Sequence, residues 1–134
     1  MDKRQTRRVN AEMTVIGGVG YNLIELAWRG RTHWSMFFVG GACFRLIGQV
    51  ERRVRASLAV KCGLCALGIT VVELVSGCIL NLWLKLGVWD YSRRRFNIKG
   101  QVCLLYSVLW LLLSVAAMPL YGLCRKGLLR LHNH

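Results

Sequence analysis

Four long apolar blocks, separated by short connections rich in arginine, constrain this chain more than any other feature. A helix needs about 20 mainly apolar residues to cross the hydrocarbon core of a bilayer. The blocks cover residues 9–28, 32–49, 56–84 and 100–123, between a basic N-terminal arm (1–8) and a basic tail (124–134). The sequence therefore predicts an all-α integral membrane bundle of four transmembrane helices, forming a single transmembrane domain over residues 1–134.

The charge of this chain is strongly positive, with a net charge of +13 from 19 Lys and Arg against 6 Asp and Glu. In a soluble protein that balance would favour nucleic acid as a partner. Here the cations mostly flank the apolar blocks and form no basic helix face, which favours topological anchoring and attraction to anionic lipid. We expect the lipid bilayer as a partner, and no nucleic acid.

The distribution of cations between the connections predicts an orientation. The arm, the connection between the second and third blocks and the tail together hold ten Lys and Arg residues, and the other two connections hold seven. Cytoplasmic segments carry the excess of Lys and Arg, so both termini are expected in the cytoplasm. The run Arg93–Arg95 is the evidence against this orientation.

Two glutamates lie inside apolar blocks, Glu25 in the first and Glu73 in the third. An ionisable side chain at membrane depth costs several kcal/mol unless it is paired or hydrated, and such residues mark functional sites. Both glutamates reach a similar depth, in the half of the bilayer nearer the connection after the third block. We predict that they form a paired intramembrane carboxylate site. The rival interpretation is a structural salt bridge, with Arg29, Arg31, Lys85 or Arg93–Arg95 as partners.

Small and polar residues recur at helical spacing in three of the blocks, which predicts packing seams with polar bonds across them. These stripes are Gly18, Asn22, Glu25 and Arg29; then Ala66, Thr70, Glu73, Gly77, Asn81 and Lys85; and then Gly100, Cys103, Ser107, Trp110, Ser114 and Ala117. The segments 20–26 and 68–74 also share a glycine five residues before a glutamate. This match indicates either two parallel two-helix repeats or a coincidence.

The connection after the third block contains supporting polar residues for this site, namely Trp89, Asp90, Tyr91, Ser92 and Asn97. Asp90 is the only acid near five cations, and a carboxylate can accept paired bonds from a guanidinium. We expect Asp90 to bind an arginine and the connection to fold back toward the bundle.

Metal, cofactor and catalytic signatures are missing from the sequence. The six cysteines lie within or beside the apolar blocks, where cysteine usually packs as a small apolar residue. Cys62 and Cys65 have the spacing of a metal or redox pair, but a zinc site needs about four ligands. We expect no metal and no cofactor. The sequence contains no GxxxxGK[ST], GxSxG or HExxH motif, so enzymatic activity is not favoured and any energy comes from a partner or an ion gradient.

One stretch of the chain resembles a known bacterial family. The residues from Glu73 to Ser92, followed by Phe96, Asn97, Gly100, Gln101, Cys103, Leu104 and Trp110, are similar to the family labelled putative ABC-transporter permease, type IV (CmpB-like). The run Arg93–Arg95 departs from that pattern, which has small or apolar residues there. The resemblance implies a multi-pass protein of the bacterial plasma membrane with a role in transport, and a separate ATPase subunit as one energy source.

Three functions remain open at this point. The first is a transport or channel component of unknown substrate, and because four short helices enclose little, it would work as a homo-oligomer or in a larger membrane complex. The second is a membrane-embedded enzyme or lipid-binding protein that uses Glu25, Glu73 and Asp90. The third is a structural accessory subunit without a site of its own.

Overall fold

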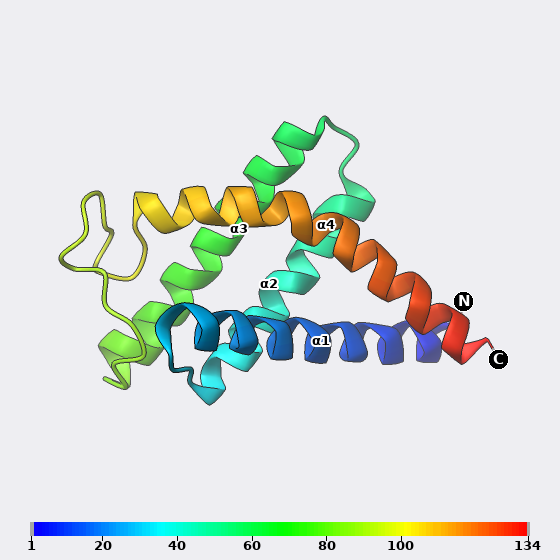
Figure 1. Ribbon diagram of the computed structural model, residues 1–134, viewed down its shortest axis with the longest axis horizontal. Helices are drawn as coiled ribbons and strands as arrows, with labels where there is room; N and C mark the ends of the chain where they lie inside the picture. Colours follow the sequence, from blue (N-terminus) through cyan, green and yellow to red (C-terminus); the bar gives the residue numbers. More distant parts are fainter. Residues whose placement is uncertain (1, 134) are drawn as a thin grey trace. The chain divides into compact units, whose positions relative to one another are not determined.

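The computed structural model describes residues 2–133, and these residues are helical apart from the connections, the longest of which covers residues 84–103 (Figure 1). The helices are α1 (Lys3–Arg29), α2 (Trp34–Arg53), α3 (Leu58–Gly77), the short π-helix η1 (Cys78–Trp83) and α4 (Leu104–His132). Within the described residues, β-pairing is limited to an isolated bridge between Ile98 and Val102. The predictions of an all-α fold and of four helices are confirmed.

Two of the helical stretches are long and apolar enough to cross a membrane, Leu58–Trp83 and Leu104–His132. The first two helices do not meet that criterion. Polar side chains such as Glu12, Asn22 and Glu25 interrupt the apolar sequence of α1, and Arg45 interrupts that of α2. The structure thus supports two candidate spans, and a four-span topology stays a prediction.

Several helix ends differ from the predicted ends of the apolar blocks. Helix α1 begins at Lys3, inside the predicted arm, because the side chain of Asp2 accepts a hydrogen bond from Gln5 N at 2.7 Å. Most of the predicted basic tail is helical as well, since α4 continues to His132. Helix α4 begins four residues later than its block, at Leu104, because the segment before it belongs to a folded connection.

The chain divides into two compact units, and the prediction of a single domain stays a prediction. Unit 1 comprises Met1–Val54 and Ala116–His134, and unit 2 comprises Arg55–Val115. Each unit is described separately below.

In unit 1, glycines allow α1 and α2 to pack at very short range. A Cβ atom added at Gly41 would lie 2.6 Å from the carbonyl oxygen of Thr14, and one added at Gly18 would lie 2.5 Å from that of Phe37. No larger residue fits at these two positions without moving the backbone. One hydrophobic core cluster of unit 1 contains Val9, Met13, Phe44 and Tyr121.

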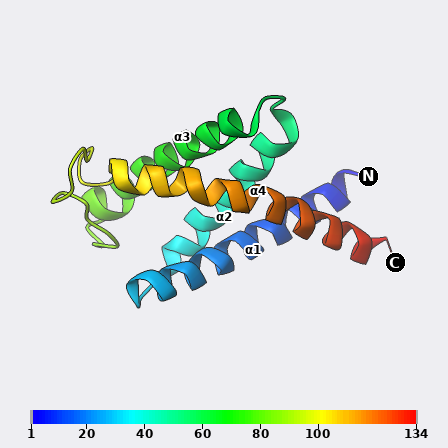
Figure 2. The ribbon, with the colours of Figure 1, turned by 45° about the horizontal axis from the view of Figure 1, so that its top comes forward.

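In unit 2, helix α3 continues directly into η1, and a connection over residues 84–103 leads to the first part of α4. Figure 2 gives a second view of these elements, and in both views the connection lies at one end of them. Residues Val88, Trp89, Gln101, Val102 and Cys103 of the connection are buried, so it is a packed part of the fold.

Candidate functional site

The polar stripes of α3 and α4 meet in unit 2. The hydroxyls of Thr70 and Ser107 lie 2.9 Å apart. One turn further along α3, the carboxylate oxygen Oε2 of Glu73 accepts a hydrogen bond from the indole Nε1 of Trp110 at 2.9 Å. Both pairs are hydrogen bonds between α3 and α4, one helical turn apart on each helix.

Glu73 is buried, with 6% of its surface exposed. The indole of Trp110 is the donor that the structure gives to its carboxylate, although an ionised carboxylate offers about four acceptor positions. Among the described residues, no lysine, arginine or histidine forms an ion pair with Glu73. The predicted salt bridge to Lys85 or to Arg93–Arg95 is therefore not found at this glutamate.

Glu25 is equally buried but has a cationic partner. Nη1 of Arg29 lies 2.8 Å from its Oε2, and the hydroxyl of Thr32 donates to its Oε1 at 3.3 Å. The same hydroxyl lies 3.0 Å from Oδ1 of Asn22, so the stripe of α1 ends in a small polar cluster. Glu25 thus forms the salt bridge to Arg29 that the sequence offered as the alternative. Glu25 belongs to unit 1 and Glu73 to unit 2, and their pairing stays a prediction.

Asn81 joins the π-helix to the connection. Its Oδ1 accepts the backbone N–H of Val88 at 2.7 Å, and its Nδ2 donates to Oε1 of Gln101 at 2.8 Å. The carbonyl of Gln101 in turn accepts the indole N–H of Trp89 at 2.9 Å. Gly77 leaves the space for this arrangement, because a Cβ added there would lie 2.5 Å from Oε1 of Gln101.

Gln101 is a residue whose role the sequence analysis missed. It is 2% exposed and it bonds to both Asn81 and Trp89. The available signal was its place at the start of the fourth apolar block, where an uncharged polar side chain can turn back onto the preceding connection. Only the family resemblance included this residue.

The segment from Trp89 to Gly100 folds back on itself. The N–H of Tyr91 donates to the carbonyl of Gly100 at 2.7 Å. Asn97 closes the turn, since its Nδ2 donates to Arg94 O at 2.8 Å and its Oδ1 accepts Gly100 N at 3.0 Å. The aromatic ring of Tyr91 also stacks on Tyr106 of α4, with ring centroids 4.8 Å apart.

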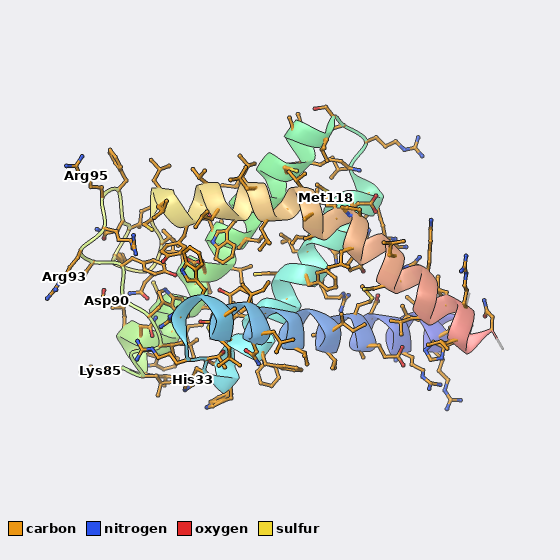
Figure 3. All side chains as sticks on the ribbon, viewed as in Figure 1. His33, Lys85, Asp90, Arg93, Arg95 and Met118 are labelled. Carbon is orange, nitrogen blue, oxygen red and sulfur yellow. The ribbon has the colours of Figure 1, made fainter. Side chains whose placement is uncertain are left out.

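Asp90, labelled in Figure 3, lies at the start of this turn. Its partner differs from the arginine that the sequence predicts. Its Oδ1 accepts the backbone N–H of Ser92 at 2.9 Å, and within residues 2–133 no ion pair forms on its carboxylate. The hydrogen bonds from Ser92 lower the pKa of Asp90, and the charge of Arg93 adds a smaller effect. Arg94 lies over the ring of Tyr106, 5.0 Å from its centroid.

Metal-ligating side chains do not gather in this structure. Within the described residues, no three His, Cys, Asp or Glu side chains come together, and Cys62 and Cys65 are buried free thiols. Unit 2 offers a buried carboxyl group with an indole donor beside it.

Comparison with known proteins identifies the family. A family model described as putative ABC-transporter type IV matches residues 18–131, which include both glutamates, the connection and α4 almost to its end. No curated protein and no solved structure matches the chain. Because the match covers well over half of the sequence, the chain belongs to the putative ABC-transporter type IV family.

Proposed function

We propose that this protein is a membrane-embedded subunit of an ABC-type transport complex, in which Glu73 binds a proton or a cation within the membrane. The family points to transport, and Leu58–Trp83 and Leu104–His132 are long and apolar enough to cross the bilayer. The observation that supports this role is that Glu73 is buried on the first of these helices and that the hydrogen-bond donor to its carboxylate is neutral.

The physical reason is the cost of a charge in a low-dielectric environment. An isolated carboxylate near the centre of a span costs about 2.5–3.5 kcal/mol on insertion scales, unless a proton or a cation neutralises it. A protonated Glu73 would keep an oxygen that accepts from Trp110, so the two helices stay joined in both states. Glu25 already has Arg29 as its counter-ion, and the proposal therefore rests on Glu73.

The remaining components of the complex follow from what this sequence does not contain. It has no P-loop motif, so we propose that a separate subunit hydrolyses ATP. The outer sides of α3 and α4 expose apolar side chains that suit lipid or further membrane subunits, including Leu67, Val71, Val75, Leu112 and Val115. Two to four short helices enclose little, so we propose a homo-oligomer or a larger complex.

The proposed location is the bacterial plasma membrane, with both termini in the cytoplasm. If only α3 and α4 span, residues 1–57 carry ten Lys and Arg and residues 84–103 carry five, so the charge bias points the same way as for four spans. Single cysteines at positions 5, 32, 56 and 94, in a background without native cysteines, separate the possibilities. Both topologies label positions 5 and 56 from one side and 94 from the other. In the four-span topology, a cysteine at position 32 is labelled from the same side of the membrane as one at position 94. In the two-span topology, it is labelled from the same side as one at position 5.

The function is tested by purifying the tagged chain from its own bacterial membrane in mild detergent. We expect a nucleotide-hydrolysing subunit to co-purify in fixed stoichiometry, and Glu73→Gln to lower its ATPase activity at least tenfold while assembly persists. Glu51→Gln, which alters a glutamate near the end of α2, is the matched control and should leave the activity unchanged. A chain that purifies without such a subunit and moves no ion in proteoliposomes would refute the proposal.

A further inference from the structure

We propose that the connection between η1 and α4 binds the phosphate groups of anionic phospholipids through Arg93, Arg95 and Lys99, with Phe96 inserted beside them. These four residues are called the tip patch below. The inference rests on the proposed membrane insertion of α3 and α4, and it adds a binding site that the transport role does not require.

The charges of the connection are unbalanced at the tip patch. Residues 85–99 contain five cations and one acid, Asp90, whose Oδ1 accepts the N–H of Ser92. Arg94 is also engaged, because its guanidinium lies over the ring of Tyr106 and donates to the hydroxyl at 3.4 Å.

The three cations of the tip patch are exposed on the surface. Figure 3 shows Arg93 and Arg95 directed away from the ribbon at the outer end of the connection. The side chains of Arg93, Arg95 and Lys99 are exposed and have no hydrogen bond or ion pair with the residues that the structure describes. A guanidinium group matches phosphate with two parallel N–H bonds, so two such groups two residues apart in sequence suit this ligand.

The exposed aromatic ring of Phe96 is a second observation, and it indicates that the ligand has an apolar part. Its side chain is 77% exposed, and its backbone adopts a left-handed conformation with φ of 55°. A bulky residue rarely takes this conformation, and such outliers occur where function fixes the backbone. Asn97 holds the turn through its bonds to Arg94 and Gly100, so the fold keeps an aromatic ring exposed among cations.

The position of the tip patch matches the headgroup layer of a bilayer. In Figures 1 and 2 the connection lies at one end of α3, η1 and α4, which places it at a membrane surface if both helices span. Trp83, the last residue of η1, is 76% exposed, and tryptophan prefers the headgroup level. At that depth cations meet lipid phosphates while an aromatic ring enters the interface. This combination favours anionic lipid over a soluble anion or an acidic protein.

The test measures the melting temperature of the purified full-length chain in detergent. We expect added phosphatidylglycerol to raise it by several degrees, because a ligand that binds only the folded state stabilises that state. Phosphatidylcholine should have little effect. In the variant Arg93→Gln, Arg95→Gln, Lys99→Gln, the concentration of phosphatidylglycerol needed for half the shift should rise at least fivefold. Phe96→Ser should produce a smaller rise.

The matched control neutralises three cations of another connection, Arg52→Gln, Arg53→Gln and Arg55→Gln, and should keep the wild-type response. A triple tip-patch variant with an unchanged lipid response overturns the inference, and so does an equal shift produced by sodium phosphate alone. The melting temperature without lipid and the helical circular dichroism signal show whether the triple variant is folded. If it is not, the single variant Arg95→Gln is used for the same measurement. Extraction of the wild-type chain from membranes by alkaline carbonate would instead refute the membrane insertion.

Discussion

Trp110 of α4 donates its indole N–H to the carboxylate of Glu73 on α3, across 2.9 Å. Together with the hydrogen bond between Thr70 and Ser107, this bond links two helices that are each apolar enough to span a membrane. The donor is neutral, and among the described residues the carboxyl group of Glu73 has no cationic partner. Glu73 therefore has a structural role in joining the two helices and a proposed functional role in binding a proton or a cation.

Exchanges at these two residues should separate those roles. Glu73→Gln keeps an amide oxygen that can accept the indole N–H, so the melting temperature in detergent should change little while proton- or cation-linked activity is lost. Trp110→Phe removes the donor and should destabilise the protein by about 1–3 kcal/mol, as expected for a buried acceptor left unsatisfied. Equal loss of stability in both variants would mean that Glu73 is a structural residue only.

Asn81 should control the order of the connection. Asn81→Ala leaves the N–H of Val88 and the amide of Gln101 without this partner, and a loss of about 1–3 kcal/mol is expected. Asn81→Asp keeps the acceptor for Val88 and should have an intermediate effect. Trypsin cleavage at Arg93–Arg95 should accelerate in the same order, whereas Asn10→Ala should leave it unchanged.

The sequence predicted the helices well because their signal is local. Long apolar blocks gave four helices, and helical spacing placed Glu73 and Trp110 on the two stripes that the structure brings together. The salt bridge between Glu25 and Arg29 was among the predicted alternatives for the same reason, since residues four apart on a helix are neighbours.

The remaining features depend on contacts between distant segments, and no local pattern contains them. The third block was predicted as one helix to residue 84, but α3 ends at Gly77 and the π-helix follows, where Asn81 binds Gln101, twenty residues later. The late start of α4 has the same origin. The predicted partner of Asp90 was an arginine because charge is visible in a sequence, whereas the backbone N–H of Ser92 becomes a partner only after the turn forms.

Asp90 should make the connection sensitive to acid. Its pKa is lowered in the folded protein by the hydrogen bonds from Ser92, so its ionised form stabilises the fold above the unfolded pKa of about 3.9. This contribution is lost as the pH falls through the lower folded-state value. Wild type should therefore lose its advantage over Asp90→Ala as the pH drops below about 4, in melting curves recorded from pH 7 to pH 3. A constant difference across that range would contradict the assignment.

Gly48 should be intolerant of even one methyl group. A Cβ atom added at this position would collide with the ring of Tyr121 in the core of unit 1. Overpacking of this kind costs about 1–3 kcal/mol, so Gly48→Ala should lower the melting temperature. Gly63→Ala is the matched control because an added Cβ there meets no atom within 4 Å, and it should leave the stability unchanged or raise it.

The pairing of Glu25 with Glu73 is the sharpest prediction from the sequence, and a double-mutant cycle tests it. Two nearby carboxylates cannot readily both stay charged in a low dielectric. Replacing one glutamate should therefore relieve the electrostatic repulsion that acts on the other. Glu25→Gln, Glu73→Gln and the double variant should then show a coupling above about 0.5 kcal/mol, in stability or in ATPase activity. Glu51→Gln combined with Glu73→Gln is the control pair and should be additive.

A second double-mutant cycle, between Glu25 and Arg29, shows how additivity between Glu25 and Glu73 should be interpreted. The observed partner of Glu25 is Arg29, so Glu25→Gln and Arg29→Gln should couple if that ion pair is the whole role of Glu25. Coupling of Glu25 to both residues would indicate that Arg29 neutralises a shared carboxylate site. Coupling to Arg29 together with additivity toward Glu73 would end the paired-carboxylate hypothesis, and it would leave Glu73 as the ionisable group on which transport depends.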